Sequence, residues 1–292
     1  MCLVKGEVNL MAQIIDGKKI SSEIKEELKE KVAALKAQGK EITLAVIQVG
    51  NDPASSVYVG NKKKSCEQIG IRSLAYELPE ETTEDALLEL IGELNERSDV
   101  HGILVQLPIP KHMNEDKVIK SIAPAKDVDG FHPQSVGALS IGQPGFISCT
   151  PAGIIQLLKR SGIEIEGKEC VVVGRSNIVG KPMALLLLRE NGTVTICHSR
   201  TKDLKEVCKR ADILVVAIGK PRFITEEYVK EGAVVIDVGI NKKDDGKLCG
   251  DFTPDANRNI TYTSVPGGVG LLTRAMLLQN TLQAYNLQNP IE

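Results

Sequence analysis

The chain has 292 residues, 36 basic and 38 acidic side chains, a formal net charge of -2 and 42% hydrophobic residues. This length exceeds the usual single domain, and the composition is that of a soluble globular protein, so two domains are expected. The near-neutral charge excludes the basic surface of a nucleic-acid-binding protein, and no apolar run is long enough to span a bilayer. We therefore expect a small-molecule partner, with no nucleic acid and no membrane.

Amphipathic and apolar runs alternate through the first half of the chain. Residues 21–37 have the spacing of an amphipathic helix that stops at Gly39. Strand-like runs follow at 43–49, 73–78 and 102–107, separated by helical patterns at 58–68 and 84–95. Alternation of this kind predicts βαβ units on a parallel sheet, and therefore an α/β fold.

A segment rich in proline and glycine, residues 107–151, separates the two halves and contains a short helical pattern at 115–121. Strand-like runs then recur at 170–173, 194–197, 213–218 and 234–238, about 20 residues apart, which is typical of a Rossmann-type doubly wound parallel sheet. We place one domain at 11–148 and a second, with the doubly wound sheet, at 149–270. The final helix, in 271–292, is expected to return to the first domain, with the active site in a cleft between the domains.

The seven cysteines are scattered and form no Cys-x-x-Cys motif. This pattern predicts neither a disulfide framework nor a metal site, and it indicates a reducing compartment. The first ten residues lack the apolar segment of a signal peptide, so we expect a cytoplasmic protein. Met11 offers a second start, and residues 1–10 would then be an extension with no role in the fold.

The stretch from Val171 to Pro182 predicts a buried strand, a tight glycine turn and a helix. Three valines run into Gly174, and Gly180 precedes Pro182 and the apolar run 183–188. The N-terminus of a helix presents unpaired backbone N–H groups that hold phosphate.

This turn departs from the usual G-x-G-x-x-G because Ser176 stands at the middle glycine position. An ordinary βα turn without a nucleotide stays open as the alternative.

The next strand ends without the carboxylate that would bind the ribose hydroxyls of NAD. Ser199, Arg200 and Arg175 instead offer donors suited to a 2′-phosphate, which indicates NADP. The alternative is that both arginines are solvated surface charges.

Several weaker signals indicate chemistry in the first half. Tyr58 and Lys62 are four residues apart on a predicted helix, so they share one face, although a Lys-Lys-Lys run is more often solvated. Gln106 is a lone amide at the end of an apolar strand. Asp127 and Asp129 lie in a turn-prone segment where such residues commonly only close turns.

Taken together, these motifs have the order seen in one enzyme family. The motifs are Tyr58-x-x-x-Lys62, Val105-Gln-Leu-Pro108, Lys126-Asp-Val-Asp-Gly130, Cys149-Thr-Pro151, Val171-Val-Val-Gly-Arg-Ser176 with Ile178-Val-Gly180, Val235-Ile-Asp-Val-Gly-Ile-Asn241 and Val265-Pro-Gly-Gly-Val-Gly270. From about Ile14 to Ala284 the chain resembles the bifunctional methylenetetrahydrofolate dehydrogenase/cyclohydrolase family.

The resemblance implies a homodimer that oxidises 5,10-methylenetetrahydrofolate with NADP and hydrolyses the methenyl product to 10-formyltetrahydrofolate. It implies that Lys62 is the catalytic lysine, that Gln106 orients it, that Tyr58 lies beside the folate and that Asp129 holds the pterin. The implied cofactor contacts are Gly174, Arg175, Ser176, Ser199 and Ile240, and the argument from the end of the strand adds Arg200. The implied folate contacts are Tyr58, Val105, Gln106, Leu107, Asp129, Pro266, Gly267, Gly268, Val269 and Gly270.

The chain departs from the family pattern at two places. Ser264 stands where the family usually has proline, and Leu271-Leu272 stands where it has Pro-Met. These departures leave the shape of the folate-side loop open.

Three other functions remain as alternatives. The first is a dehydrogenase without cyclohydrolase activity, against which Lys62 and Gln106 argue. The second is a dinucleotide-sensing module without turnover, and the third is a dehydrogenase of amino or hydroxy acids, which would need a proton-accepting His or Lys at the reacting carbon.

Overall fold

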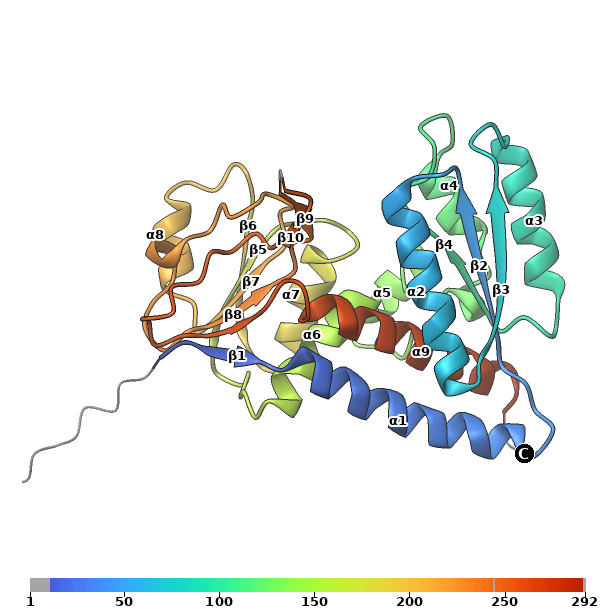
Figure 1. Cartoon of the computed structure of the whole chain (residues 1–292), viewed down its shortest axis with the longest axis horizontal. Helices are drawn as coiled ribbons and strands as arrows, with labels where there is room; N and C mark the ends of the chain where they lie inside the picture. The colour runs from blue at the N-terminus through green and yellow to red at the C-terminus, as the bar shows by residue number, and fades with distance from the viewer. Residues whose placement is uncertain (1–10, 244, 291–292) are drawn as a thin grey trace, which may run out of the picture. The chain divides into compact units, whose positions relative to one another are not determined.

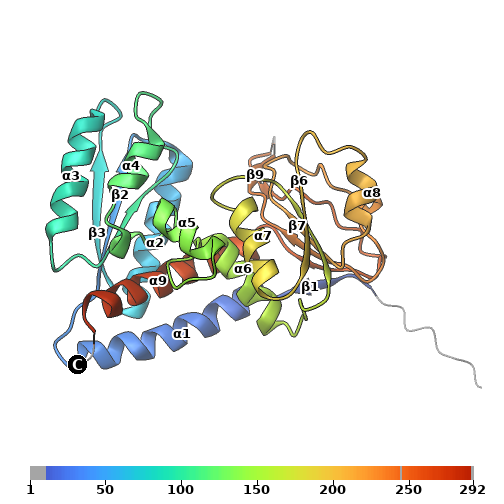
Figure 2. The same cartoon turned by 180° about the vertical axis from the view of Figure 1, so that it is seen from behind.

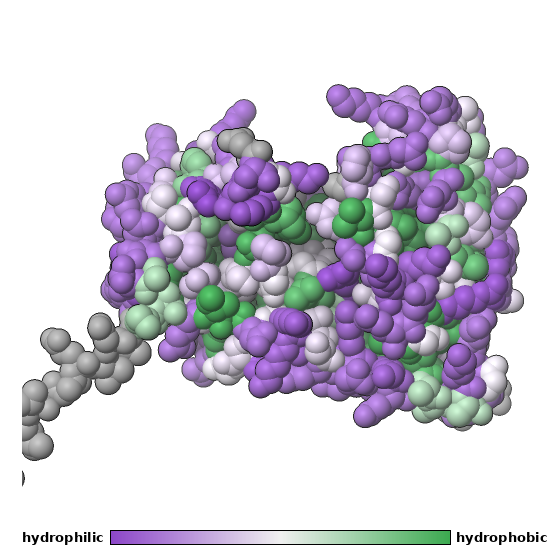
Figure 3. Space-filling view, in the orientation of Figure 1, coloured by the Kyte–Doolittle hydropathy of each residue, from purple (hydrophilic) through white to green (hydrophobic). Residues whose placement is uncertain are grey.

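The computed structural model describes residues 11–243 and 245–290 (Figure 1). The expected extension, residues 1–10, lies outside them. The described chain forms two compact units: residues 11–18 and 154–270 make one, here called the six-stranded unit, and residues 19–153 and 271–290 make the other, the three-stranded unit. Among the described helices none is long and apolar enough to cross a membrane. The face of the molecule drawn in Figure 3 is mostly hydrophilic, with scattered apolar side chains.

The three-stranded unit is built on a parallel sheet with the order β3-β2-β4. Its strands are β2 (Thr43–Val49), β3 (Arg72–Leu78) and β4 (Gly102–Val105). Alternate residues of the central strand, Ala45, Ile47 and Val49, point into one core with Leu87, Ile91 and Leu94 of α3 (Glu84–Glu96). The apolar face of the strand, formed by every second residue, therefore packs against the apolar face of α3.

Two long helices, one from the beginning of the sequence and one from its end, also belong to the three-stranded unit. They are α1 (Gly17–Lys36) and α9 (Val269–Gln288), drawn in blue and red in Figures 1 and 2. The Ser21 hydroxyl donates to the Leu271 carbonyl over 3.1 Å, and Gln288 Nε2 donates to the His101 carbonyl over 2.8 Å. The predicted return of the last helix to the first domain is confirmed.

The six-stranded unit is a parallel sheet with the order β1-β11-β8-β7-β5-β6. Its strands are β1 (Gln13–Ile15), β5 (Glu169–Val173), β6 (Thr193–Cys197), β7 (Ile213–Val216), β8 (Val234–Asp237) and β11 (Thr261–Thr263). From β5 the chain passes outward through α7 (Gly180–Arg189) to β6, and then through α8 (Leu204–Lys209) to β7 on the other side of β5. The predicted doubly wound α/β fold is confirmed, and the strand order reverses between β5 and β7.

Eight further elements occur in the described chain. They are α2 (Pro53–Ile69), α4 (Glu115–Ser121), η1 (Pro124–Lys126), α5 (Pro133–Ser140), α6 (Cys149–Arg160), η2 (Glu226–Tyr228), and the antiparallel pair β9 (Asn241–Lys242) and β10 (Leu248–Cys249). The patterns did not predict α5, α6, α8, β1, β9, β10 or β11, nor the short helices η1 and η2. α5 lies in the segment interpreted as a linker, and its first residue is Pro133, which suits the first turn of a helix because its nitrogen carries no hydrogen.

Candidate functional site

Helix α2 carries Tyr58 and Lys62 and has defined ends. Asp52 accepts a hydrogen bond from the Ser55 amide over 2.8 Å, and Pro53 occupies the first turn. The helix ends at Gly70, whose φ of 89° is the left-handed conformation that favours glycine. These caps fix the helix, so Tyr58 and Lys62 stay one turn apart on it.

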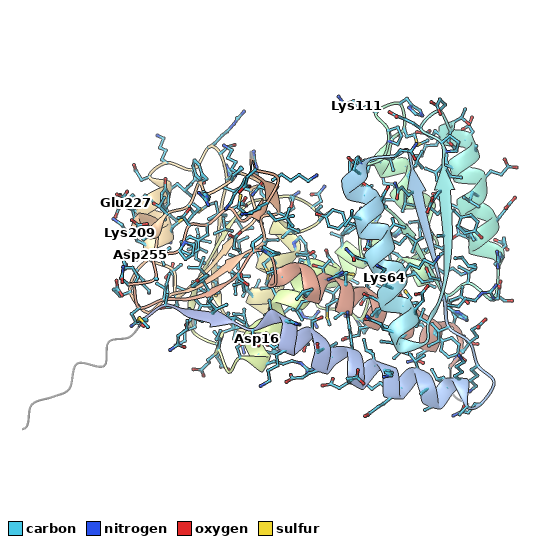
Figure 4. All side chains as sticks on the ribbon, in the orientation of Figure 1. Asp16, Lys64, Lys111, Lys209, Glu227 and Asp255 are labelled. Atoms are coloured by element: carbon cyan, nitrogen blue, oxygen red, sulfur yellow. The ribbon has the colours of Figure 1, made fainter. Side chains whose placement is uncertain are left out.

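Lys62 differs from the two lysines that follow it. Its side chain is half-buried, whereas Lys63 and Lys64 are exposed; Figure 4 labels Lys64 on α2. Lys62 Nζ donates to Gln106 Oε1 over 2.9 Å. The lysine run is therefore not a uniform solvated face, because its first member is held by an amide.

Gln106 lies just beyond β4 and continues the ladder of the sheet. Its amide donates to the Ile47 carbonyl over 2.8 Å, and its side-chain Nε2 donates to the Leu107 carbonyl over 2.6 Å. Because the nitrogen of the side-chain amide is taken in this way, its oxygen faces Lys62. Val105 is buried at the end of β4, Leu107 is half-buried, and the peptide between Leu107 and Pro108 is cis.

The two aspartates of the turn after η1 have different surroundings. Asp127 accepts hydrogen bonds from the Phe131 amide (3.2 Å), the His132 amide (2.9 Å) and the Ser135 hydroxyl (2.7 Å), so it closes a turn. Among the described residues, the only hydrogen-bond neighbour of the Asp129 carboxylate is the Cys149 thiol, 4.0 Å from Oδ1. The carboxylate of Asp129 is therefore left with free acceptor capacity.

Burial raises the pKa of Asp129 to about 6, the charge of Lys62 acts in the opposite direction, and Asp127 adds to the rise. Burial also raises the pKa of the Cys149 thiol, with Asp129 adding to it, so the thiol remains protonated and can donate. Lys62, Gln106 and Asp129 thus form one cluster: an amide holds the ammonium, and a carboxylate lies within the reach of its charge.

Asn280 of α9 binds the backbone next to Asp129 and was not recognised in the sequence. Its Nδ2 donates to the Val128 carbonyl (2.8 Å) and the Ile147 carbonyl (2.9 Å), and it lies 3.6 Å from Cys149 Sγ. Asn280 is buried, as are most of the apolar residues of α9. A lone amide on the apolar face of a helix was the available signal, since a buried amide requires partners.

The glycine turn of the six-stranded unit requires both of its glycines. Gly174 follows β5 with φ of 133°, a conformation that side-chain-bearing residues rarely adopt, and a Cβ there would strike the Ala217 carbonyl. A Cβ on Gly180, at the start of α7, would strike the Gly174 peptide. Bare backbone therefore packs against bare backbone at the end of β5.

Ser176 has a role in the turn that the motif did not indicate. Its hydroxyl accepts hydrogen bonds from the Val179 amide (3.2 Å) and the Gly180 amide (3.3 Å). Two of the amides at the start of α7 are therefore already engaged, whereas the side chains of Arg175 and Ser176 are exposed.

The end of β6 presents the donors predicted from the sequence. The residues from His198 to Thr201 form a turn in which the Arg200 amide donates to His198 Nδ1 over 3.1 Å. Ser199 and Arg200 are exposed, and within the described chain neither Arg175 nor Arg200 forms an ion pair. Both guanidinium groups are thus free to bind an anion, as bidentate recognition of phosphate requires.

Two further segments of the six-stranded unit carry predicted contacts. Ile240, after β8, is 47% exposed, which is high for a large apolar residue. The loop from Pro266 to Gly270 follows a cis peptide, and Gly267 has φ of 109°. A Cβ on Gly17 would lie 2.7 Å from the Gly267 carbonyl oxygen, so the loop packs on the start of α1. Val269 is buried, and so is Leu272, one of the residues that differ from the family pattern.

Among the described residues, no three His, Cys, Asp or Glu side chains are grouped to hold a metal ion, and all six described cysteines are unpaired and buried.

Two family models match the chain. The tetrahydrofolate dehydrogenase/cyclohydrolase catalytic domain matches residues 15–129, and the NAD(P)-binding domain of the same family matches residues 148–289. Together they cover more than half of the chain.

Individual relatives agree with these matches. A bifunctional protein FolD from Lachnoclostridium phytofermentans is 74% identical over 272 residues, which are 92% of this chain and 96% of that protein. The crystal structure of bifunctional FolD from Campylobacter jejuni is 49% identical with a TM-score of 0.92, covering 94% of this chain and 99% of that one. The Trypanosoma brucei FolD structure, described as complexed with NADP cofactor and an inhibitor, is 38% identical with a TM-score of 0.92 and covers 96% and 99%.

Proposed function

The chain belongs to the tetrahydrofolate dehydrogenase/cyclohydrolase family, and we propose that it oxidises 5,10-methylenetetrahydrofolate with NADP and hydrolyses the methenyl product to 10-formyltetrahydrofolate. The family resemblance drawn from the motifs is confirmed by both family models and by the relatives at high identity. The observation that carries the hydrolytic half of the proposal is the 2.9 Å hydrogen bond from Lys62 to Gln106 beside Asp129.

The oxidation needs placement of the substrate and no base. The reacting carbon lies between two nitrogens, whose lone pairs stabilise the cation that remains when hydride leaves. NADP, when bound, accepts that hydride. On this chain's side, Tyr58 would lie along the folate and Asp129 would accept hydrogen bonds from the pterin, so the two residues fix the position of the reacting carbon.

The hydrolysis needs proton transfer. Water adds to the methenyl carbon and loses a proton, and one carbon–nitrogen bond then breaks as its nitrogen takes up a proton. Lys62 Nζ is the group proposed to pass protons between the water and that nitrogen. Its bond to Gln106 holds Nζ in one place for both transfers.

The six-stranded unit has features that fit a dinucleotide. Gly174 and Gly180 leave the backbone bare where a Cβ would fill the space, and Arg175, Ser199 and Arg200 offer exposed donors for a phosphate. The glycine turn would approach the pyrophosphate of NADP, and the exposed donors would hold its 2′-phosphate. Ile240 would contact the cofactor with its exposed side chain.

We also propose the division of labour implied by the motifs, with residues 11–148 and 271–292 expected on the folate side and residues 149–270 on the cofactor side. The compact units differ from these bounds at two places, because residues 11–18 belong to the six-stranded unit and residues 149–153 to the three-stranded unit. Pro266 to Gly270 would cover the substrate. The family resemblance further supports a cytoplasmic homodimer, and light scattering on the purified protein tests whether it is a dimer.

A coupled assay with 5,10-methylenetetrahydrofolate tests the function. Reduced NADP and the methenyl product are followed separately by absorbance, with NADP and with NAD. We expect NADP to be reduced and the methenyl signal to decay. Reduction without decay would indicate the dehydrogenase-only alternative, against which the Lys62–Gln106 bond argues. Binding of dinucleotide without any reduction would indicate a sensing module.

A further inference from the structure

Two carboxylates are buried together at the carboxyl edge of the six-stranded sheet. Asp237 is the last residue of β8 and is 3% exposed, and Asp251, after β10, is fully buried. Among the described residues neither forms an ion pair; every group that donates to them is a neutral N–H. The mechanism above assigns neither of them a role, although buried carboxylates are costly unless their acceptors are used.

Asp251 connects the ends of two strands. Its Oδ2 accepts from the amides of Ile218 (2.8 Å) and Gly219 (2.9 Å), which follow β7. Its Oδ1 accepts from the side-chain nitrogen of Asn241 over 2.9 Å, directly after Ile240. One side chain thus fixes the loop after β7 and the loop after β8.

Asp237 in turn holds Asp251 in place. Its Oδ1 accepts from the Gly239 amide (2.9 Å) and the Asp251 amide (3.0 Å), and its Oδ2 accepts from the Phe252 amide (2.9 Å). A Cβ on Gly239 would strike the Asp251 carboxylate, so a larger residue cannot stand there.

The loop that Asp251 holds forms one wall of the glycine turn. Ala217 directly precedes Ile218, and its carbonyl is the group that a Cβ on Gly174 would strike. The end of β7 therefore packs against the end of β5, where the strand order reverses. In parallel sheets this is the point at which ligands bind outside the carboxyl ends of the strands.

We propose that Asp251, supported by Asp237, is a positioning residue for the dinucleotide, because it fixes the peptide after β7 against Gly174 and the backbone beside Ile240. The inference rests on the proposed use of NADP. Asp251 would not touch the cofactor itself; it would act through the loops after β7 and β8.

Asp251→Asn tests the proposal, because the amide replaces one acceptor oxygen with an NH2 group that meets N–H donors. We expect the KM for NADP and the Kd for NADPH, measured by fluorescence titration, to rise about 10-fold to 100-fold, the usual loss for hydrogen bonds to a charged group. We expect kcat at saturating NADP to change by less than about twofold. A loss of global structure would not separate KM from kcat in this way.

Asp212→Asn is the matched control, since Asp212 lies at the opposite edge of the same sheet. It accepts from the Glu169 amide over 2.8 Å and pairs with Lys230 over 2.7 Å. We expect its KM for NADP to match that of the wild-type protein. Asn241→Ala is a milder second variant, because it removes one donor and leaves both carboxylates, and its KM should rise in the same direction by a smaller factor.

The proposal is overturned if Asp251→Asn melts cooperatively and binds NADPH as tightly as the wild type, or if Asp212→Asn raises the KM equally. If Asp251→Asn does not fold, Asn241→Ala decides: an unchanged KM overturns the proposal, and a raised KM supports it. A wild-type protein that reduces no NADP would instead overturn the proposed function, so the two failures are distinguishable.

Discussion

The two parallel sheets present different chemistry at their carboxyl ends. In the three-stranded unit, the end of β4 and the neighbouring helix α2 supply reactive side chains, with Lys62 bonded to Gln106. In the six-stranded unit, the ends of β5 and β7 supply bare peptide at Gly174, and the buried carboxylates there bind backbone amides. This difference matches the proposed function, in which one sheet would carry the proton chemistry and the other would hold a ligand by its shape and by hydrogen bonds.

The largest expected effect comes from Lys62→Met. Removing a positioned proton-transfer group lowers rates by about 10²-fold to 10⁴-fold, so we expect hydrolysis of methenyltetrahydrofolate to be lost on this scale while folate binding remains measurable. The methenyl absorbance of purified variants gives the rate. Lys64→Met, on an exposed lysine of the same helix, is the control and should hydrolyse at the wild-type rate. Unchanged hydrolysis in Lys62→Met would refute the assignment.

Asp129→Asn tests whether a carboxylate holds the substrate. We expect the KM for the folate to rise about 100-fold at pH 7, because the amide replaces one of the two acceptor oxygens with an NH2 group that would meet an N–H of the pterin. In the wild type, folate affinity should fall as the pH drops below about 6, where Asp129 becomes protonated. An affinity that is equally pH-dependent in Asp129→Asn would contradict this role.

The same substitution should stabilise the protein. The pKa of Asp129 is raised from 3.8 to about 6, so the folded state binds the proton more tightly than the unfolded state. The stability that this proton gives is full below pH 3.8 and is lost as the pH rises through 6. At pH 7 we expect Asp129→Asn to raise the free energy of unfolding by roughly 1–3 kcal/mol in urea titrations. A destabilised variant would show that the Asp129 carboxylate has a stabilising partner in the folded protein.

A smaller effect is expected on the cofactor side from the double variant Arg175→Gln with Arg200→Gln. Losing the charged donors should weaken NADP relative to NAD by about 10-fold in kcat/KM, while the rate with NAD stays near the wild-type value. Arg189→Gln, at the exposed far end of α7, is the control. An unaltered preference would show that both arginines are solvated surface charges.

The smallest effect is expected from Asn280→Ala, which removes a buried side-chain amide of the three-stranded unit. It leaves the Val128 and Ile147 carbonyls without their donor, at a cost of about 1–3 kcal/mol in stability. Because Val128 adjoins Asp129, the KM for the folate should rise a few-fold. Gln279→Ala, on the exposed neighbour, should change neither quantity. Lost stability with an unchanged KM would limit Asn280 to a purely structural role.

Most of the fold was predictable because its strands are apolar and regularly spaced. The runs at 43–49 and 115–121 coincide with β2 and α4, and the others differ by a few residues at their ends. β1 could not be found, since three residues carry no periodicity and its partner β11 is about 250 residues away. The helix α8 was missed because its six residues are too few to show a helical period.

The site was predictable in part. Spacing alone placed Tyr58 and Lys62 on one helix face, but only the family resemblance distinguished Lys62 from its neighbours, because half-burial depends on tertiary packing. The different surroundings of Asp127 and Asp129 could not be predicted either. Each depends on donors from other segments: the Ser135 hydroxyl for Asp127, and the Cys149 thiol for Asp129.

The partition of the chain has a consequence for fragment expression. Each compact unit is assembled from two separate stretches, so a single cut cannot liberate either one whole. A fragment of residues 154–270 would lack β1 and leave β11 as an unprotected sheet edge, which invites self-association. A fragment of residues 19–153 would lack α9 and, with it, Asn280. Excising either half for crystallography would therefore require a linker that joins its two pieces.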